Sequence, residues 1–166
     1  MKRVIICVVV GAALALPGST EASVYTGDVL GITLRQKSKL REITVFGGLP
    51  LNCDEGQTTT DGSLDISRWR WNPPYPRVKH RRFHVVEPKT QAYAVVDNGG
   101  NVVGTERDEY VLDARGRFNK SYGKASGTVR ITGSYRGPSP LDPELGMIQY
   151  HNCDSGTVQW KVHTLY

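Results

Sequence analysis

The chain has 166 residues, of which 22% are charged and 39% are hydrophobic, and its formal net charge is +5. This length suits one domain with a hydrophobic core of its own, so we expect no second domain. The small excess of positive charge excludes a strong field over the whole molecule, so attraction for anions must be local. Beyond the N-terminal apolar run, the sequence holds no segment of the roughly 20 apolar residues that a membrane-spanning helix needs.

The first residues have the pattern of a secretory signal peptide. Residues 1–3, Met-Lys-Arg, are a positively charged start, and residues 4–16 are an apolar run. Small residues near Ala22 favour cleavage after that residue. Cys7 lies in the apolar run without the small flanking residues that lipid attachment needs, so we expect it to leave with the leader. The sequence therefore predicts a signal peptide over residues 1–22 and a single secreted domain over the rest of the chain.

Alternation of apolar and polar residues recurs after the leader, and no stretch has convincing helical periodicity. Strands of this kind have one dry face and one wet face, as in antiparallel sheets. The 18 glycines and 9 prolines supply turns at short intervals, which favours a sandwich or a barrel over an α/β fold. We therefore predict an all-β, jelly-roll-like antiparallel β-sandwich, with an open β-barrel as the alternative. The clearest strands are residues 30–35, 43–45, 110–114, 128–133 and 158–163.

Three segments have the composition of turns. Residues 97–100, Asp-Asn-Gly-Gly, tolerate positive φ and lie between the apolar segments 92–96 and 101–105, so they predict a β-hairpin. Residues 113–118 look like a bend inside or between strands. Residues 137–143 contain three prolines, each of which removes a ladder donor, and they predict a surface loop between the last two long strands.

A short motif, Asn-Cys-Asp-x-Gly, occurs at residues 52–56 and again at residues 152–156. It contains the two cysteines outside the leader, Cys53 and Cys153, and an even number in an oxidising compartment favours one structural disulfide. In the chain-entropy model, a bridge that closes a loop of this length removes roughly 4 to 5 kcal/mol of unfolded-state entropy. Two buried free thiols are the alternative. A catalytic cysteine has less support, because no histidine motif accompanies either position.

Three motifs in the last third of the chain carry a resemblance. They are Gly-Arg-Phe at 116–118, Gly-Lys-Ala-Ser-Gly-Thr-Val-Arg at 123–130, and Cys-Asp-Ser-Gly-Thr-Val-Gln-Trp at 153–160. Over residues 113–162 the chain resembles secreted bacterial proteins of unknown function, frequent among actinobacteria, which share a G-x-F element, a G-x-A-x-G-T-x-R strand and a terminal C-x-[ST]-G-x-x-x-W strand. The resemblance implies a β-sandwich and a secreted location. It carries over no catalytic residue, because these are scaffold features, and residues 68–105 depart from the pattern.

Residues 68–83 have the most unusual local composition, and we call them the basic aromatic stretch. Their Lys and Arg side chains supply charge for phosphates, carboxylates or sulfates, and their rings supply flat faces for sugars or headgroups, with cation–π contact between the two. We therefore predict a non-catalytic module that binds an anionic polysaccharide or another cell-envelope component. The candidate ligand-binding residues are Trp69, Arg70, Trp71, Tyr75, Arg77, Lys79, Arg81 and Arg82.

A structural interpretation competes with this one. Trp69 and Trp71 share one face at strand spacing, so they can belong to the core while the neighbouring arginines point to water. Nucleic acid is not expected as a partner, because basic residues on a secreted protein meet anionic lipids and wall polymers first. His80 and His84 do not converge in an extended chain, and zinc needs three or four ligands. We predict no metal and no cofactor.

Two further functions stay open. A lectin-like glycoside hydrolase would place two carboxylates about 5 to 9 Å apart across a concave face, but the sequence identifies no pair. A structural envelope protein would need no small partner at all. No G-x-S-x-G motif supports serine chemistry. The candidate carboxylates are Glu42, Glu87, Glu106, Asp108 and Glu109, of which the run 106–109 looks like a solvated turn.

Overall fold

The computed structural model describes residues 22–46, 48–59, 68–138 and 146–165. Most of the expected signal peptide falls on residues 1–21, which lie outside these ranges. The described residues form eleven strands: β1 (Ala22–Thr26), β2 (Leu30–Arg35), β3 (Lys39–Val45), β4 (Pro50–Cys53), β5 (Gly56–Thr59), β6 (Arg68–Arg70), β7 (Arg82–Val96), β8 (Val102–Phe118), β9 (Lys124–Pro138), β10 (Met147–Asp154) and β11 (Val158–Thr164).

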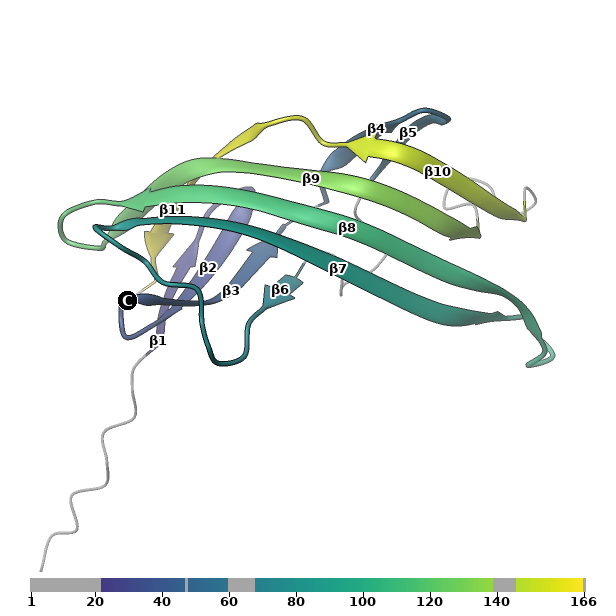
Figure 1. Cartoon of the computed structure of the whole chain (residues 1–166), viewed down its shortest axis with the longest axis horizontal. Coiled ribbons are helices and arrows are strands. Elements are labelled where there is room, and N and C mark those ends of the chain that lie inside the picture. Colours follow the sequence, from purple (N-terminus) through teal and green to yellow (C-terminus); the bar gives the residue numbers. More distant parts are fainter. Residues whose placement is uncertain (1–21, 47, 60–67, 139–145, 166) are drawn as a thin grey trace, which may run out of the picture.

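All the strand pairs are antiparallel and belong to one sheet. The path runs β5-β4-β10-β9-β11-β1-β2-β3-β6, and β8 pairs with both β7 and β9. The first half of β9 pairs with β11 and its second half with β10, so these two strands share one edge of β9. This shared edge lets the sheet divide into two layers. β7, β8, β9 and β10 form a long layer that arches over a short layer of β11, β1, β2, β3 and β6 (Figure 1).

The hydrophobic core lies between the two layers. We call the side of the long layer that faces the short layer its inner face, and the opposite side its outer face. Leu34 of β2, Ile43 of β3, Leu112 of β8 and Ile131 of β9 are all fully buried in one cluster. Each belongs to an alternating segment of the sequence, so the period of two that predicts strands also selects the buried side. The prediction of an all-β antiparallel fold is confirmed.

β6 lies near β7, but no backbone hydrogen-bond ladder joins the two strands among the described residues. Lys89 of β7 donates a hydrogen bond to the carbonyl of Arg68 at 2.9 Å, and its ammonium lies 5.8 Å from the ring centre of Trp69. The side chain of Lys89 therefore joins the edge of β7 to the edge of β6, although no backbone ladder does so. The described strands are not closed into a barrel, and a two-layered sheet describes them best.

The predicted disulfide is present between Cys53 of β4 and Cys153 of β10, with a Cα–Cα distance of 4.0 Å across a sequence separation of 100 residues. The two Asn-Cys-Asp motifs lie side by side, because Asn52 pairs with Asp154 in the ladder. The bridge and this pair attach the β4–β5 hairpin to the edge of the long layer.

The hairpin predicted around residues 97–100 is confirmed, and it is longer than the sequence indicates. β7 and β8 pair from Arg82 with Arg117 to Val96 with Val102, with one register shift between Val95 and Val96. The bend expected at residues 113–118 is wrong, because these residues continue β8 without a break. Of the Pro-rich segment 137–143, the first two residues end β9 and the others fall outside the described residues.

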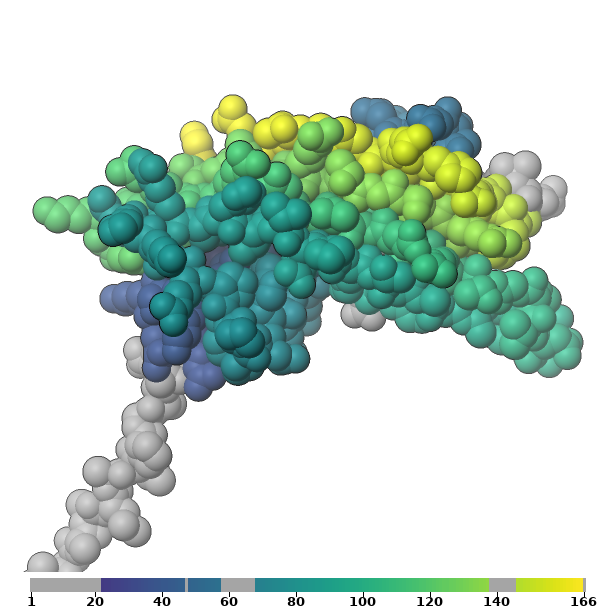
Figure 2. All heavy atoms as spheres, in the orientation of Figure 1, coloured from purple at the N-terminus to yellow at the C-terminus, as the bar shows by residue number. Residues whose placement is uncertain are grey.

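The end of this hairpin extends past its neighbours. β8 pairs with β9 only as far as Arg107 with Arg136, whereas the β7–β8 ladder continues to Val96. We call residues 93–106 the arm. Figures 1 and 2 show the arm projecting from the rest of the molecule at the end of the long layer.

Candidate functional site

The structure divides the basic aromatic stretch into two parts. In the first part, Trp69 and Trp71 are buried, with exposed fractions of 2% and 9%. Arg68 and Arg70 point the other way and pair with the carboxylate of Glu42, at 3.3 Å and 3.2 Å. The core interpretation of the two tryptophans is therefore correct, and neither ring is available to a ligand. Arg70 is exposed but already has an acidic partner.

The second part runs beside the start of β3 and then turns into β7. The hydroxyl of Tyr75 accepts a hydrogen bond from Arg35 at 3.3 Å, so this ring is engaged by a cation of the protein itself. Lys79 and Arg82 exchange backbone hydrogen bonds of 2.9 Å and 2.8 Å around a tight turn in which Arg81 has a φ of 64°. This turn fixes the position at which β7 begins.

Arg82, the first residue of β7, lies directly opposite Arg117 of β8. The adjacent pair, Arg81 with Phe118, is hydrogen-bonded, because Phe118 N–H donates to the carbonyl of Arg81 at 2.8 Å. Arg82 and Arg117 therefore occupy a non-hydrogen-bonded pair, in which opposite residues approach most closely, with about 4.5 Å between Cα atoms. Like charges at directly opposite positions destabilise a sheet. The fold accepts this cost at the outer face of its long layer.

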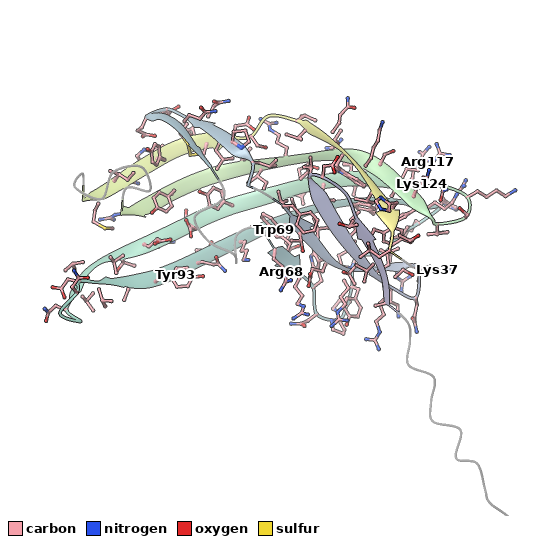
Figure 3. The ribbon with its side chains drawn as sticks, turned by 180° about the vertical axis from the view of Figure 1, so that it is seen from behind. Lys37, Arg68, Trp69, Tyr93, Arg117 and Lys124 are labelled. Carbon is pink, nitrogen blue, oxygen red and sulfur yellow. A yellow bond between two sulfur atoms is a disulfide. The ribbon has the colours of Figure 1, made fainter. Side chains whose placement is uncertain are left out.

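Further basic residues extend this pair into a larger surface. Arg117 is opposite Ser126 of β9, and Ser126 is opposite Lys161 of β11, so one row crosses the outer face over β7, β8 and β9 and continues onto β11 of the short layer. All the basic members are exposed, and Figure 3 shows Arg117 and Lys124 at the end of the long layer remote from Tyr93. We define the cationic face as Arg82, Arg115, Arg117, Lys124 and Lys161.

One acidic residue, Asp113, lies beside this face. Its carboxylate accepts hydrogen bonds from Arg115 at 3.1 Å and 3.2 Å and lies 3.0 Å from Nε2 of His84. The hydrogen bond from Arg115, more than the nearby charges, lowers the pKa of Asp113 from its ordinary value. Asp113 therefore stays ionised and neutralises part of the positive charge of Arg115. The other four members have no ion pair within the described part of the chain.

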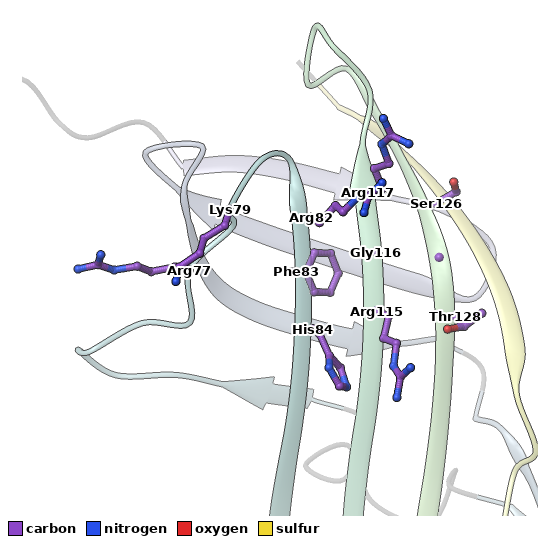
Figure 4. A pocket seen from close by; sticks show the side chains of 11 residues that line it. Arg77, Lys79, Arg82, Phe83, His84, Arg115, Gly116, Arg117, Ser126 and Thr128 are labelled. Atoms are coloured by element: carbon purple, nitrogen blue, oxygen red, sulfur yellow. The ribbon is translucent and has the colours of Figure 1, made fainter.

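A shallow, open depression of about 590 Å³ lies over Arg82, Arg115 and Arg117 (Figure 4). Arg77 and Lys79 of the basic aromatic stretch also line it, and Ser126 and Thr128 supply hydroxyl groups. The depression is therefore rich in hydrogen-bond donors and in positive charge. Such a surface can hold carboxylate, sulfate or phosphate groups, and arginine can do so with two parallel hydrogen bonds.

A second depression of about 830 Å³ lies further along the sheet and differs in charge. Its lining includes Arg130, His151 and Asp154. The guanidinium of Arg130 pairs with Asp154 at 2.9 Å, and His151 hydrogen-bonds Glu55 through both its backbone N–H and its ring. These hydrogen bonds lower the pKa values of Asp154 and Glu55. Each charge here has a partner, so the second depression is not a comparable site for anions.

The carboxylates considered for hydrolysis do not form an accessible pair at Glu106 and Asp108. These two lie two residues apart on the inner face of β8, and Asp108 is only 1% exposed. Burial, assisted by the charge of Glu106, raises the pKa of Asp108 to about 6. Both of its oxygens are without a hydrogen-bond partner among the described residues. The run 106–109 is thus part of a strand, and the prediction of a solvated turn there is wrong.

Two of the other candidate carboxylates, and the turn residue Asp97, are engaged in contacts within the protein. Glu42 pairs with two arginines, and Glu109 accepts a hydrogen bond from Arg107 at 2.6 Å. Asp97 accepts the N–H groups of Gly99 and Asn101 at 2.8 Å and 2.9 Å, which stabilises the turn of the arm. Among the described residues, no three His, Cys, Asp or Glu side chains gather as metal ligands would.

No described helix is long and apolar enough to cross a membrane. No protein-family model, curated protein or solved structure matches the chain. The resemblance of residues 113–162 to secreted actinobacterial proteins therefore stays a prediction. The cationic face is the candidate site that the geometry itself provides.

Of the five residues of the cationic face, the basic aromatic stretch of the sequence identifies only Arg82. Arg115, Arg117, Lys124 and Lys161 come from three other strands and carry no local motif. Their signal in the sequence is weak: each is a basic residue at a wet position of an alternating segment. Only the register of the strands brings them to one surface.

Proposed function

We propose that this protein is a non-catalytic binding module that holds an anionic polymer, such as an acidic polysaccharide of the cell envelope, on its cationic face. The observation that carries the proposal is the direct opposition of Arg82 and Arg117 with no acidic partner for either in the described residues. This arrangement is unfavourable in the free protein. It becomes favourable when an anion lies between the two guanidinium groups.

The distribution of charge favours a polymer over a small anion. Neighbouring strands are about 4.8 Å apart, so a row across four strands spans about 14 Å, and successive outward residues on one strand are about 6.8 Å apart. A single carboxylate or sulfate would contact only two or three of the five cations. A chain of anions would contact the whole face, and many weak contacts would add to one another. The shallow, open shape of the depression suits a ligand that continues beyond it.

The disulfide supports a place of action outside the cytoplasm, because structural disulfides persist in oxidising compartments. The charged start and apolar run of the leader support the same location. In the cell envelope, acidic polysaccharides are accessible to an exposed face of this kind. Salt screens charges that lie in water, so binding weakens as ionic strength increases.

The test measures binding of the oxidised protein to fluorescent dextran sulfate, with neutral dextran as the control ligand. The variant Arg82→Gln/Arg117→Gln removes the opposed pair. The matched control, Arg68→Gln/Arg70→Gln, removes two arginines of the same stretch that pair with Glu42 and do not belong to the cationic face. Both variants change the net charge equally, so they separate local from overall electrostatics.

We expect the wild type and the control variant to bind dextran sulfate alike at low salt, and Arg82→Gln/Arg117→Gln to bind at least about tenfold more weakly. The wild-type affinity decreases as salt is added, and this decrease is smaller for Arg82→Gln/Arg117→Gln. Equal loss in the two double variants would show that net charge alone matters. Binding to neutral dextran with the same affinity, or no binding to either polymer, would refute the proposal.

A further inference from the structure

The free edge of β7 is a second surface with a definite geometry. β7 has 15 residues, and among the described strands it pairs only with β8. Phe118 N–H bonds the carbonyl of Arg81, whereas Lys79 and Arg82 bond each other on the opposite side. Backbone groups alternate in direction along a strand. The odd-numbered residues of β7 therefore point their N–H and C=O groups to β8, and the even-numbered residues point theirs to the free edge.

Residues 90–96, Thr-Gln-Ala-Tyr-Ala-Val-Val, form the outer part of this edge and contain no charge and no proline. Pro88 precedes them at an even position, where its missing N–H faces the edge, as expected for an edge proline. Natural edge strands are usually protected by charges, prolines or bulges. The β7–β8 bulge lies in the register between Val95 and Val96, at the far end of the segment. Residues 90–95, between Pro88 and this bulge, contain no charge, proline or bulge of their own.

The segment is also accessible. Thr90, Ala92 and Ala94 are exposed, and Tyr93 and Val96 have exposed fractions of 40% and 58%. Figures 1 and 2 show the edge of the arm standing away from the described body of the molecule. The edge-facing backbone groups of Thr90, Ala92, Ala94 and Val96 have no ladder partner among the described strands, and such a row on an uncharged strand is a template for another strand.

We propose that residues 90–96 pair antiparallel with the same segment of a second copy of this chain, about a two-fold axis at Tyr93. This register pairs Thr90 with Val96 and Ala92 with Ala94 of the second copy. All four edge-facing residues then find hydrogen-bonding partners, and Pro88 stays outside the paired segment. A register centred one residue earlier places Pro88 opposite Val96 and loses a donor. A register centred one residue later places Thr90 against the turn residue Asn98.

Charge supports the same register. The axis at Tyr93 places Lys89, whose ammonium also bonds the carbonyl of Arg68 within its own copy, opposite Asp97 of the second copy, and this arrangement of opposite charges occurs twice by symmetry. No two residues of like charge lie opposite each other over the paired segment. Because a two-fold interface uses the same patch on both subunits, it closes the dimer and leaves residues 90–96 of neither copy open to a third chain. In the dimer, residues 90–96 of each subunit cover the same segment of the other subunit.

The first experiment measures molar mass by size-exclusion chromatography with light scattering, over a range of concentrations, for the complete oxidised chain. The variant Ala94→Pro removes an edge-facing N–H that makes no bond to β8, and the matched control Ala94→Val keeps that N–H. We expect a concentration-dependent dimer for the wild type and for Ala94→Val. We expect a dissociation constant at least about tenfold higher for Ala94→Pro. A wild type that is monomeric throughout, or an Ala94→Pro protein that dimerises like it, would overturn the proposal.

A second experiment tests the register and does not depend on the fold of the proline variant. Tyr93→Cys places two thiols at directly opposite positions on the axis, where Cβ atoms are about 4.5 to 5.5 Å apart, within reach of a disulfide after small adjustment. Gln91→Cys lies opposite Val95 of the second copy and serves as the control. We expect a covalent dimer from Tyr93→Cys under mild oxidation and a monomer from Gln91→Cys. Cross-linking of both variants to the same extent, or of neither, contradicts this pairing.

Discussion

The indole of Trp160 lies on Gly116, in the space where any other residue would place its side chain. A Cβ built at Gly116 would be 2.6 Å from two atoms of this ring. Phe83, opposite Gly116 on β7, stacks beside the indole, with ring centres 6.0 Å apart and an angle of 22° between the rings, and its own ring would lie 2.5 Å from that Cβ. Gly127 is opposite Gly116 on β9, and a Cβ built at Gly127 would lie 2.7 Å from the same indole ring. Glycine at these two positions therefore lets the aromatic core approach the long layer directly.

The substitution Gly127→Ala tests this packing. Its Cβ would lie 1.8 Å from the carbonyl oxygen of Arg115, and backbone cannot move aside as a side chain can. We expect a decrease of about 3 kcal/mol or more in the free energy of unfolding, measured by urea denaturation. Gly123→Ala is the control, because its nearest neighbour, Ser121 Oγ, would be at 3.4 Å. Equal stability of the two variants would contradict the packing described for Trp160.

The disulfide closes a loop of 100 residues, so its removal should have a large effect. We expect Cys53→Ser/Cys153→Ser to lose roughly 4 to 5 kcal/mol of unfolding free energy in the chain-entropy model, because the unfolded chain gains freedom. Urea denaturation of this variant and of the oxidised wild type gives the difference. A loss below about 1 kcal/mol would mean that the unfolded state is already restricted without the bridge.

Asp108 should make the stability of the protein depend on pH in an unusual direction. Its pKa is raised to about 6 in the folded protein, mainly by burial, from an ordinary value of 3.8. The folded state therefore holds this proton more tightly than the unfolded state does. The contribution of Asp108 to the free energy of unfolding therefore decreases as the pH increases from about 4 through about 6, by a total of about 3 kcal/mol.

Asp108→Asn keeps the shape of the protonated acid and removes the titration. We expect the variant to gain stability relative to the wild type between about pH 4 and about pH 7.5, as measured by denaturation at both values. The comparison with the variant is essential, since Glu55, Asp113 and Asp154 have lowered pKa values and favour the folded state as the pH increases. A constant difference at the two pH values would show that the pKa of Asp108 is the same in the folded and unfolded states.

Trp69 and Arg70 are neighbours in the sequence and should behave very differently. Trp69→Ala removes a side chain that is 2% exposed, and we expect a loss of about 3 to 5 kcal/mol in unfolding free energy. Arg70→Ala removes an exposed member of an ion pair with Glu42, and we expect a change below about 1 kcal/mol. Chemical denaturation of both variants provides the measurement. Comparable losses would place the two side chains in similar surroundings.

Local patterns in the sequence predict much of this fold. The alternation in residues 30–35 and 158–163 identifies β2 and β11, because one face of each strand is buried in the core. The repeated cysteine motif predicts the disulfide, and the Asp-Asn-Gly-Gly turn predicts the hairpin of β7 and β8. The length of that hairpin is not predicted, since Gly116 between two arginines has the composition of a turn while remaining in a strand. Residues 113–118 look like a bend for that reason.

The candidate site is less accessible to sequence reasoning. A stretch with both arginine and tryptophan looks like one binding surface, but strand alternation directs Trp69 inward and leaves Arg70 outside. The partners of Arg82 are Arg117 and, further across the sheet, Lys161, which lies 79 positions away in the sequence. Their proximity depends on the register of four strands. That register is determined by the packing of the whole core and not by residues near the site.

β8 runs without a break from Arg117 to the arm, and this continuity has a consequence for avidity. Arg117 and Glu106, which is opposite Tyr93, are eleven residue steps apart on one strand, a distance of about 36 Å. In the dimer proposed above, the two-fold axis is perpendicular to the joined sheet, so both cationic faces look to the same side and lie up to about 70 Å apart. A long anionic chain can then lie on both faces at once, and release from one leaves it tethered to the other.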